Sequence, residues 1–147
     1  MRILASTLGD LMYQGWLNPS IGIGDVEVIV PVPLHPSRER ERGYNQASLL
    51  ALHMGACLGI PVDDGLLERS KPTRPQVGLS GLERRKNVRD AFRCVDTALA
   101  GKKILLIDDV CTSSSTLEAA CRTLRDVGAS SVWAYTLARA RRSATIV

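Results

Sequence analysis

The chain is built around residues 102–128, KKILLIDDVCTSSSTLEAACRTLRDVG. The first half of this stretch joins a run of four apolar residues, 104–107, to two carboxylates, Asp108 and Asp109. A continuous apolar run is typical of a strand that is buried on both faces of a parallel sheet. We therefore expect a central strand over 104–107, with both carboxylates at the point where the strand emerges into solvent.

The second half of the stretch predicts a loop and then a helix. Residues 112–116 are small and carry hydroxyl groups, and an amphipathic helix follows them until Gly128 ends it. Ser115 and Glu118 have the spacing of a capping box, which specifies where the helix begins. The expected buried face consists of Leu117, Ala120, Cys121, Leu124 and Val127.

This combination of residues suits recognition of a phosphorylated sugar. Backbone N–H groups and the dipole at a helix N-terminus attract an anion, and hydroxyl side chains add donors to phosphate oxygens. Two adjacent carboxylates can accept hydrogen bonds from vicinal ribose hydroxyls, or help to hold a hydrated divalent metal. A buried strand followed by a solvated turn would have the same composition, so the residue types alone leave both interpretations open.

The segment ILLIDDVCTSSST, residues 104–116, resembles the phosphoribosyl pyrophosphate (PRPP) motif of the type I phosphoribosyltransferases. That motif usually reads as four apolar residues, two acidic residues, an apolar and a variable residue, and then Thr-Thr-Gly-small-Thr. The resemblance implies that Asp108 and Asp109 are catalytic residues that face the ribose hydroxyls. The residues expected to wrap the 5-phosphate are Thr112, Ser113, Ser114, Ser115 and Thr116.

Ser114 departs from this motif, because the family usually has glycine at that position. If the loop required a positive φ there, a serine would cost free energy that glycine does not. We then expect weaker phosphate binding or a different loop shape.

Length and composition indicate one globular domain over residues 1–147, without repeats or low-complexity segments. No apolar run approaches the roughly 18–20 residues that a membrane-spanning helix needs. The N-terminal residues lack the pattern of a signal peptide, so we expect a cytoplasmic protein. The net charge of +4 suits an anionic ligand such as phosphate, pyrophosphate or nucleic acid.

The cysteines do not have metal-binding spacing, since no C-x-x-C pair is present. We expect all of them to be reduced, with Cys57 and Cys121 on buried helix faces. The two histidines, His35 and His53, are interpreted as structural or exposed rather than catalytic.

The remaining chain alternates helical and strand patterns, which predicts an α/β fold with a mainly parallel central sheet flanked by helices. Ligands bind at the carboxyl ends of the strands in such sheets. The Pro-rich loop after the first strand and the two carboxylates should therefore share one edge. The expected elements are a helix over 3–17, a strand over 26–30, a stiff loop over 31–36, a helix over about 45–58, a short strand over 66–69 and a strand over 132–137.

Two expectations concern the surfaces of these elements. The helix over about 45–58 should end at Gly59, and its buried face should contain Leu50, Met54 and Cys57. The alternating Arg/Glu run over 38–42 is interpreted as a solvated turn. The helix over 3–17 should carry an apolar stripe that consists of Ile3, Leu4, Leu8, Leu11 and Met12.

Residues 69–93 form a basic segment with eight Arg or Lys residues against two acidic residues, interrupted by proline and glycine. A long basic loop in a compact domain is usually functional or disordered. Ser80 and Glu83 could cap a short helix inside it.

Two further segments resemble the ComF family, the competence-associated phosphoribosyltransferase-like proteins. They are VPVPLHPSRERERGYNQASLLA (30–51) and KPTRPQVGLSGLERRKNVRDAF (71–92). The resemblance implies that about 70–90 is a flexible loop that closes over bound PRPP, with Arg84 as a catalytic residue and Lys71 as a pyrophosphate contact. The remaining pyrophosphate-binding residues implied are Pro33, Leu34, His35, Pro36 and Ser37. Many members carry an N-terminal cysteine-rich zinc module, which we do not find in this sequence, so we expect its partner contacts to be missing.

The resemblance implies a phosphoribosyltransferase of nucleotide metabolism that binds Mg²⁺-PRPP and transfers the phosphoribosyl group to an unidentified nitrogenous acceptor. Mg²⁺ is expected to bind through PRPP, with Asp108 and Asp109 as candidates for direct contact. One alternative is a PRPP- or nucleotide-binding protein without transfer activity, which serves competence, DNA uptake or regulation. Another is a nucleic-acid-binding protein that uses residues 69–93, although the single Phe and three Tyr provide few rings for base stacking. Enzymatic activity and the oligomeric state are left open.

Overall fold

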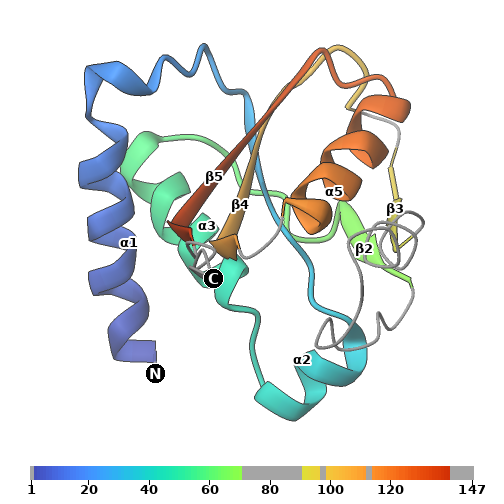
Figure 1. The fold of residues 1–147 in the computed structure, drawn as a ribbon, viewed down its shortest axis with the longest axis horizontal. Coiled ribbons are helices and arrows are strands. Elements are labelled where there is room, and N and C mark those ends of the chain that lie inside the picture. The colour runs from blue at the N-terminus through green and yellow to red at the C-terminus, as the bar shows by residue number, and fades with distance from the viewer. Residues whose placement is uncertain (1, 71–90, 97–98, 112–113, 140–147) are drawn as a thin grey trace, which may run out of the picture.

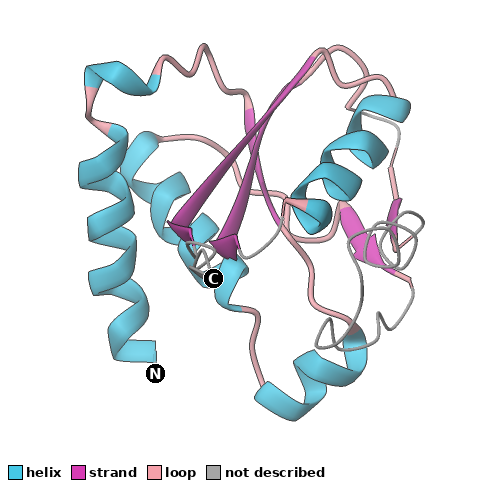
Figure 2. Cartoon of the chain, viewed as in Figure 1, coloured by secondary structure: helices cyan, strands magenta, loops and turns pink. Residues whose placement is uncertain are grey.

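A computed structural model describes residues 2–70, 91–96, 99–111 and 114–139 (Figure 1). Its strands are β1 (Val28–Pro31), β2 (Leu67–Arg69), β3 (Phe92–Cys94), β4 (Lys103–Cys111) and β5 (Ser131–Arg139). Its helices are α1 (Arg2–Trp16), the short 3-10 helix η1 (Pro19–Ile21), α2 (Pro36–Arg42), α3 (Gln46–Leu58) and α5 (Ser115–Asp126). Figure 2 shows helices on either side of a central sheet, so the predicted α/β architecture is confirmed.

β4 is the central strand of a three-stranded parallel sheet in the described part of the chain, with the order β1-β4-β5. Its four apolar residues, 104–107, are all 0% exposed, which confirms the predicted buried strand. A further segment runs along the other side of β1, because the N–H of Asp63 donates to the carbonyl oxygen of Ile29 at 2.9 Å.

Alternate residues of β4 face two separate cores. Ile104 and Leu106 pack with Leu124 of α5 and with the antiparallel pair β2–β3. Leu105 and Ile107 pack on the opposite face with α1 and α3. This division follows from the period of two in a strand, and it places α5 and β2–β3 on one side of the sheet and α1 and α3 on the other (Figure 1).

The expected apolar stripe of α1 is only partly correct. Met12 is buried and Leu8 is partly buried against the core, but Leu4 and Leu11 are 53% and 60% exposed. The face that packs inward instead follows Ala5, Leu8, Met12 and Trp16, the spacing of three to four residues that one helix face requires. The side chain of Ile3 lies outside the described part.

The buried face of α3 also differs from its prediction at one position. Leu50 and Met54 are fully buried, whereas Cys57 is exposed. Leu58, four residues after Met54, packs against the core in its place. Both ends of the helix agree with the sequence signals, because Asn45 caps its start and Gly59, with φ of 67°, follows its end.

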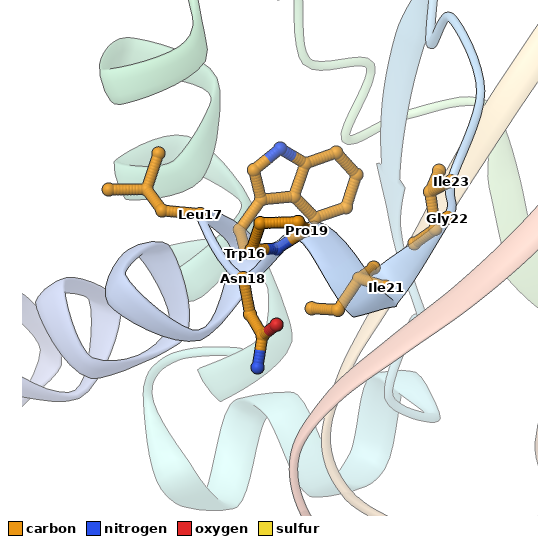
Figure 3. Close-up of a pocket in the computed structure, with 7 residues that line it drawn as sticks. All are labelled: Trp16, Leu17, Asn18, Pro19, Ile21, Gly22 and Ile23. Carbon is orange, nitrogen blue, oxygen red and sulfur yellow. The ribbon is translucent and has the colours of Figure 1, made fainter.

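A hollow of about 250 Å³ lies where α1 gives way to η1 and the segment that leads into β1 (Figure 3). It is lined by Trp16, Leu17, Asn18, Pro19, Ile21, Gly22 and Ile23. In Figure 1 this segment lies at the opposite end of the sheet from the arrowheads of β4 and β5. The hollow is therefore remote from the predicted site.

Candidate functional site

The two segments predicted to form a site meet at the carboxyl edge of the sheet. β1 ends at Pro31, and the N–H of the next residue, Val32, donates a 2.8 Å hydrogen bond to the carbonyl oxygen of Ile107. Asp108 directly follows Ile107 in β4. The start of the Pro-rich loop is thus attached to β4 one residue before the first carboxylate.

Asn45 fixes the same loop from its other side. Its Nδ2 donates a 3.0 Å hydrogen bond to the carbonyl oxygen of Val32, and its Oδ1 accepts the N–H of Ala47 at 3.1 Å. Asn45 is 8% exposed, so both bonds are shielded from water. The backbone at Val32 is therefore held between β4 and the start of α3. Pro33 and Leu34 follow it as partly buried loop residues.

The expected solvated turn over 38–42 is a helix in the structure. His35 caps α2 through its Nδ1, which accepts the N–H of Ser37 at 3.3 Å and lies 2.7 Å from the Ser37 hydroxyl. Pro36 occupies the first turn, where a missing N–H costs nothing, and Gly43 ends the helix with φ of 76°. The run is exposed, as expected, but Pro36 and Ser37 are helical rather than part of the loop.

Asp108 and Asp109 do not lie beyond the end of their strand. β4 continues to Cys111 because β5 continues beside it, with Asp108 paired to Thr136 and Cys111 to Arg139. The expectation that the strand ends at Ile107 is therefore wrong. The N–H of Asp109 donates to Oδ1 of Asp108 at 2.9 Å, and the N–H of Val110 donates to Oδ1 of Asp109 at 2.8 Å.

The carboxyl group of Asp108 is electrostatically unusual. Burial is the main cause that raises its pKa to about 7, and repulsion from the Asp109 carboxylate adds to the effect. The hydrogen bond from the N–H of Asp109 and the positive charge of Arg69 act in the opposite direction. Near neutral pH this carboxyl group is poised between its two forms, so a cation or a hydrogen-bond donor would stabilise the ionised form.

Arg69, which falls in both the expected strand 66–69 and the basic segment, had no predicted role, but its charge acts on Asp108. It lies on β2, where it is paired with Phe92 of β3, and its guanidinium carbon is 5.4 Å from the centroid of the Phe92 ring. Burial is the main cause that lowers its pKa, the charge of Arg38 lowers it further, and the charge of Asp108 raises it. The alternation of Leu67, Glu68 and Arg69 was the available signal, because it puts Arg69 on the side of Leu67.

The predicted phosphate loop is described only from Ser114 onward. Ser114 is the N-cap residue of α5 and has φ of −62°, an ordinary value for serine, so this position is unstrained without glycine. Ser115 and Thr116 are the first residues of α5. The expected capping box of Ser115 is absent, and the hydroxyl of Ser114 bonds to the carboxylate of Glu118 instead.

Several predicted residues lie outside the described ranges. Thr112 and Ser113 of the phosphate loop are among them. So are Lys71 and Arg84, together with the short helix expected at residues 80–83.

The described residues contain no group of three or more His, Cys, Asp or Glu side chains placed to hold a metal ion. All four cysteines are free thiols. The two adjacent carboxylates, Asp108 and Asp109, fit Mg²⁺, which usually takes one or two protein carboxylates and completes its shell with water and substrate phosphate oxygens. None of the helices in the described ranges has the length and apolar character needed to cross a bilayer.

Comparison with known proteins assigns the class. Residues 50–146 match the model of the phosphoribosyl transferase domain, so the chain belongs to this family. The chain is 20% identical to a glutamine PRPP amidotransferase from B. subtilis, with a TM-score of 0.59 over 90% of this chain and 26% of that chain. It is 14% identical to a Trypanosoma cruzi hypoxanthine phosphoribosyl transferase, with a TM-score of 0.52 over 96% and 74% of the two chains. These likenesses confirm the type I phosphoribosyltransferase-like fold.

The similar sequences include proteins named for competence and for DNA utilization. The chain is 39% identical over 116 residues to competence protein F of Haemophilus influenzae, covering 78% of this chain and 51% of that protein. It is 36% identical over 117 residues to competence protein ComFC of Bacillus subtilis, with 76% and 44% covered. It is 33% identical over 138 residues to DNA utilization protein YhgH of Escherichia coli, with 92% and 60% covered. These names support the resemblance to the ComF family, and the chain spans about half the length of the curated relatives it matches.

Proposed function

We propose that this domain binds PRPP together with Mg²⁺ at the carboxyl edge of its sheet and transfers the phosphoribosyl group to a nitrogenous acceptor. The observation that best supports the proposal is the hydrogen bond from Val32 to Ile107, because it fixes the start of the Pro-rich loop beside the strand that carries Asp108 and Asp109. Membership of the phosphoribosyl transferase domain family supports it.

Each part of the edge has a role in this proposal. Asp108 and Asp109 accept hydrogen bonds from the ribose hydroxyls. The hydroxyl residues 112–116 take the 5-phosphate at the N-terminus of α5, where unpaired backbone N–H groups and the helix dipole favour an anion. The pyrophosphate binds along residues 33–37 and to Lys71, and Arg84 acts on the leaving group.

The reaction is a substitution at C1 of the ribose. A nitrogen lone pair of the acceptor forms the new bond to C1, the C1–O bond breaks, and its electron pair leaves with pyrophosphate. The proton lost from the acceptor nitrogen passes to solvent. Mg²⁺, when bound, neutralises charge on the diphosphate. The carboxylates of Asp108 and Asp109 hold the sugar in place, and their negative charge stabilises the oxocarbenium-like ribose as the bond breaks.

Two measurements test this function on the purified chain. PRPP should raise the unfolding temperature, because a ligand that binds only the native state stabilises that state. The rise should require Mg²⁺, since we propose that PRPP binds together with the metal. Pyrophosphate release in the presence of PRPP and a panel of purine and pyrimidine bases should then identify an acceptor. A chain that shows no stabilisation by PRPP at any Mg²⁺ concentration would contradict the proposal.

A second candidate follows from the names of the relatives, which include competence and DNA utilization proteins. In that case the domain binds PRPP or a nucleotide without transfer and acts in DNA uptake or in regulation, through contact with nucleic acid or with the competence machinery. Mg²⁺-dependent PRPP binding without pyrophosphate release from any base would favour it. Salt-sensitive binding of single-stranded DNA that persists after Asp108→Asn with Asp109→Asn would instead favour a nucleic-acid site in the basic segment 69–93.

A further inference from the structure

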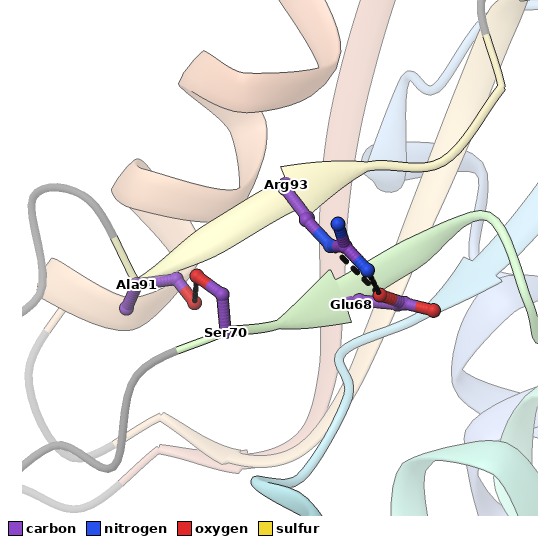
Figure 4. A network of polar contacts seen from close by, with 4 residues as sticks. All are labelled: Glu68, Ser70, Ala91 and Arg93. Carbon is purple, nitrogen blue, oxygen red and sulfur yellow. Dashed lines mark hydrogen bonds and ion pairs between the residues drawn. The ribbon is translucent and has the colours of Figure 1, made fainter.

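The two-stranded sheet β2–β3 carries two arginines on opposite faces. Arg93 points outward and forms an ion pair with Glu68, in which the Arg93 and Glu68 side chains are 68% and 47% exposed (Figure 4). Arg69 follows Leu67 with one residue between them, so the two share a face, and Leu67 is 2% exposed in the core. Arg69 therefore points toward the parallel sheet, and Arg93 points away from it.

The inward side of β2 and one side of β4 contribute to the same core. Leu67 of β2 and Phe92 of β3 belong to the same core as Ile104 and Leu106. Arg69 lies two residues after Leu67 on β2, and Asp108 lies two residues after Leu106 on β4. Arg69 and Asp108 therefore both lie just beyond apolar residues of one core, and the charge of each acts on the other. The Phe92 ring, 5.4 Å from the guanidinium carbon, supports Arg69 on one side by a cation–π contact.

The charges around Arg69 are suited to an anion. Arg38, which lies on the exposed helix α2, repels Arg69, and burial together with this repulsion lowers the Arg69 pKa. A partly buried guanidinium whose charge is opposed by a neighbouring arginine gains from an anionic group beside it. A guanidinium also matches phosphate geometry with two parallel N–H donors.

The chemistry of PRPP indicates which anion this is. Its diphosphate is attached to C1, and the adjacent C2 carries one of the two ribose hydroxyls. If Asp108 accepts from these hydroxyls, as the proposed function holds, a cation beside Asp108 lies next to the diphosphate. Resting on that function, we propose that Arg69 is a binding residue for the diphosphate of PRPP and stabilises its charge as it leaves.

The test compares Arg69→Gln with Arg93→Gln as the matched control, since both remove one arginine from the same two-stranded sheet. Binding of PRPP, inorganic pyrophosphate and ribose 5-phosphate is measured by calorimetry with Mg²⁺ present. Arg69→Gln should weaken PRPP and pyrophosphate binding about 10-fold or more, the loss expected for a charge-assisted hydrogen bond. It should leave ribose 5-phosphate binding unchanged, and Arg93→Gln should change none of the three.

Arg69→Lys keeps the charge and the aliphatic stem, so it provides a second variant if Arg69→Gln does not fold. It should bind pyrophosphate more weakly than the wild type because lysine lacks the planar pair of donors. Wild-type pyrophosphate affinity in either variant overturns the role of Arg69 while the proposed function stands. Equal weakening of all three ligands also overturns it, because that pattern marks a structural role. A wild-type chain that binds no PRPP overturns both proposals.

Discussion

The backbone N–H of Val32 donates a 2.8 Å hydrogen bond to the carbonyl oxygen of Ile107, the residue directly before Asp108. Two segments that are about half the chain apart in sequence are thereby fixed at one edge of the sheet. The carbonyl oxygen of Val32 is in turn bonded to the buried amide of Asn45. The start of the loop that we assign to pyrophosphate is therefore held by one backbone hydrogen bond and one side-chain hydrogen bond.

Removal of the Asn45 side chain tests this arrangement. Asn45→Ala should lower the free energy of unfolding by about 1–2 kcal/mol, because α3 loses its cap and the Val32 carbonyl loses its partner. PRPP binding should weaken as well, since the loop is no longer held. Urea denaturation and calorimetry measure the two effects. Asn18→Ala is the control, because Asn18 caps the exposed helix η1 at the other end of the sheet. Equal PRPP affinity in both variants would contradict the positioning role.

The paired carboxylates provide the second prediction. Asp108→Asn combined with Asp109→Asn should abolish the thermal stabilisation by PRPP, because both groups lose their negative charge while keeping their shape. The fold should persist, since neither side chain belongs to the two apolar cores. Circular dichroism checks the fold. A doubly substituted chain that PRPP still stabilises normally would show that the ribose contacts are assigned wrongly.

The raised pKa of Asp108 provides the third prediction. This pKa is about 7 in the folded chain against a usual value of 3.8, so the folded state binds the proton more tightly than the unfolded state. The contribution of Asp108 to stability is therefore greatest below about pH 4 and is lost as the pH rises toward and through 7. Denaturant unfolding from pH 5 to pH 8 should show that Asp108→Asn, which does not titrate, gains stability relative to the wild type as the pH rises. A constant difference between the two chains would refute the assignment.

A close approach between α3 and the following segment provides the fourth prediction. A Cβ added to Gly55 would lie 2.8 Å from the carbonyl oxygen of Ile60 and would overlap a methyl group of Val62. Gly55→Ala should therefore destabilise the fold by about 1–3 kcal/mol, as overpacking usually does. Gly24→Ala is the control, because its Cβ would meet only the Trp133 ring at ordinary distances of 3.5–3.6 Å. Similar unfolding midpoints for the two variants would contradict the prediction.

The elements that the sequence predicts correctly are those with strong local signals. The buried run 104–107 has no polar residue to interrupt it, and α3 carries a cap residue at Asn45 and a stop at Gly59. Local signals also predicted that the Pro-rich loop and the carboxylates share one edge, since each directly follows an apolar run with a strand pattern. The residue types of this edge were therefore predictable.

Features that depend on a distant partner were not predictable in the same way. β4 extends to Cys111 because β5 continues beside it, which no local pattern of β4 encodes. Arg69 lies near Asp108 because β2 pairs with β3 and packs on the sheet. The sequence shows only that Arg69 is the first residue of the basic segment 69–93. Helix α2 was not predicted because its seven residues, five of them charged, have no apolar face, and only its caps indicate a helix.

Calorimetric titration of the wild-type chain with PRPP, with and without Mg²⁺, tests the central claim most directly. Saturable binding of one PRPP per chain that requires Mg²⁺ is the predicted result. Absence of PRPP binding in the presence of Mg²⁺, or binding that is the same without the metal, would contradict a Mg²⁺-PRPP site beside Asp108 and Asp109.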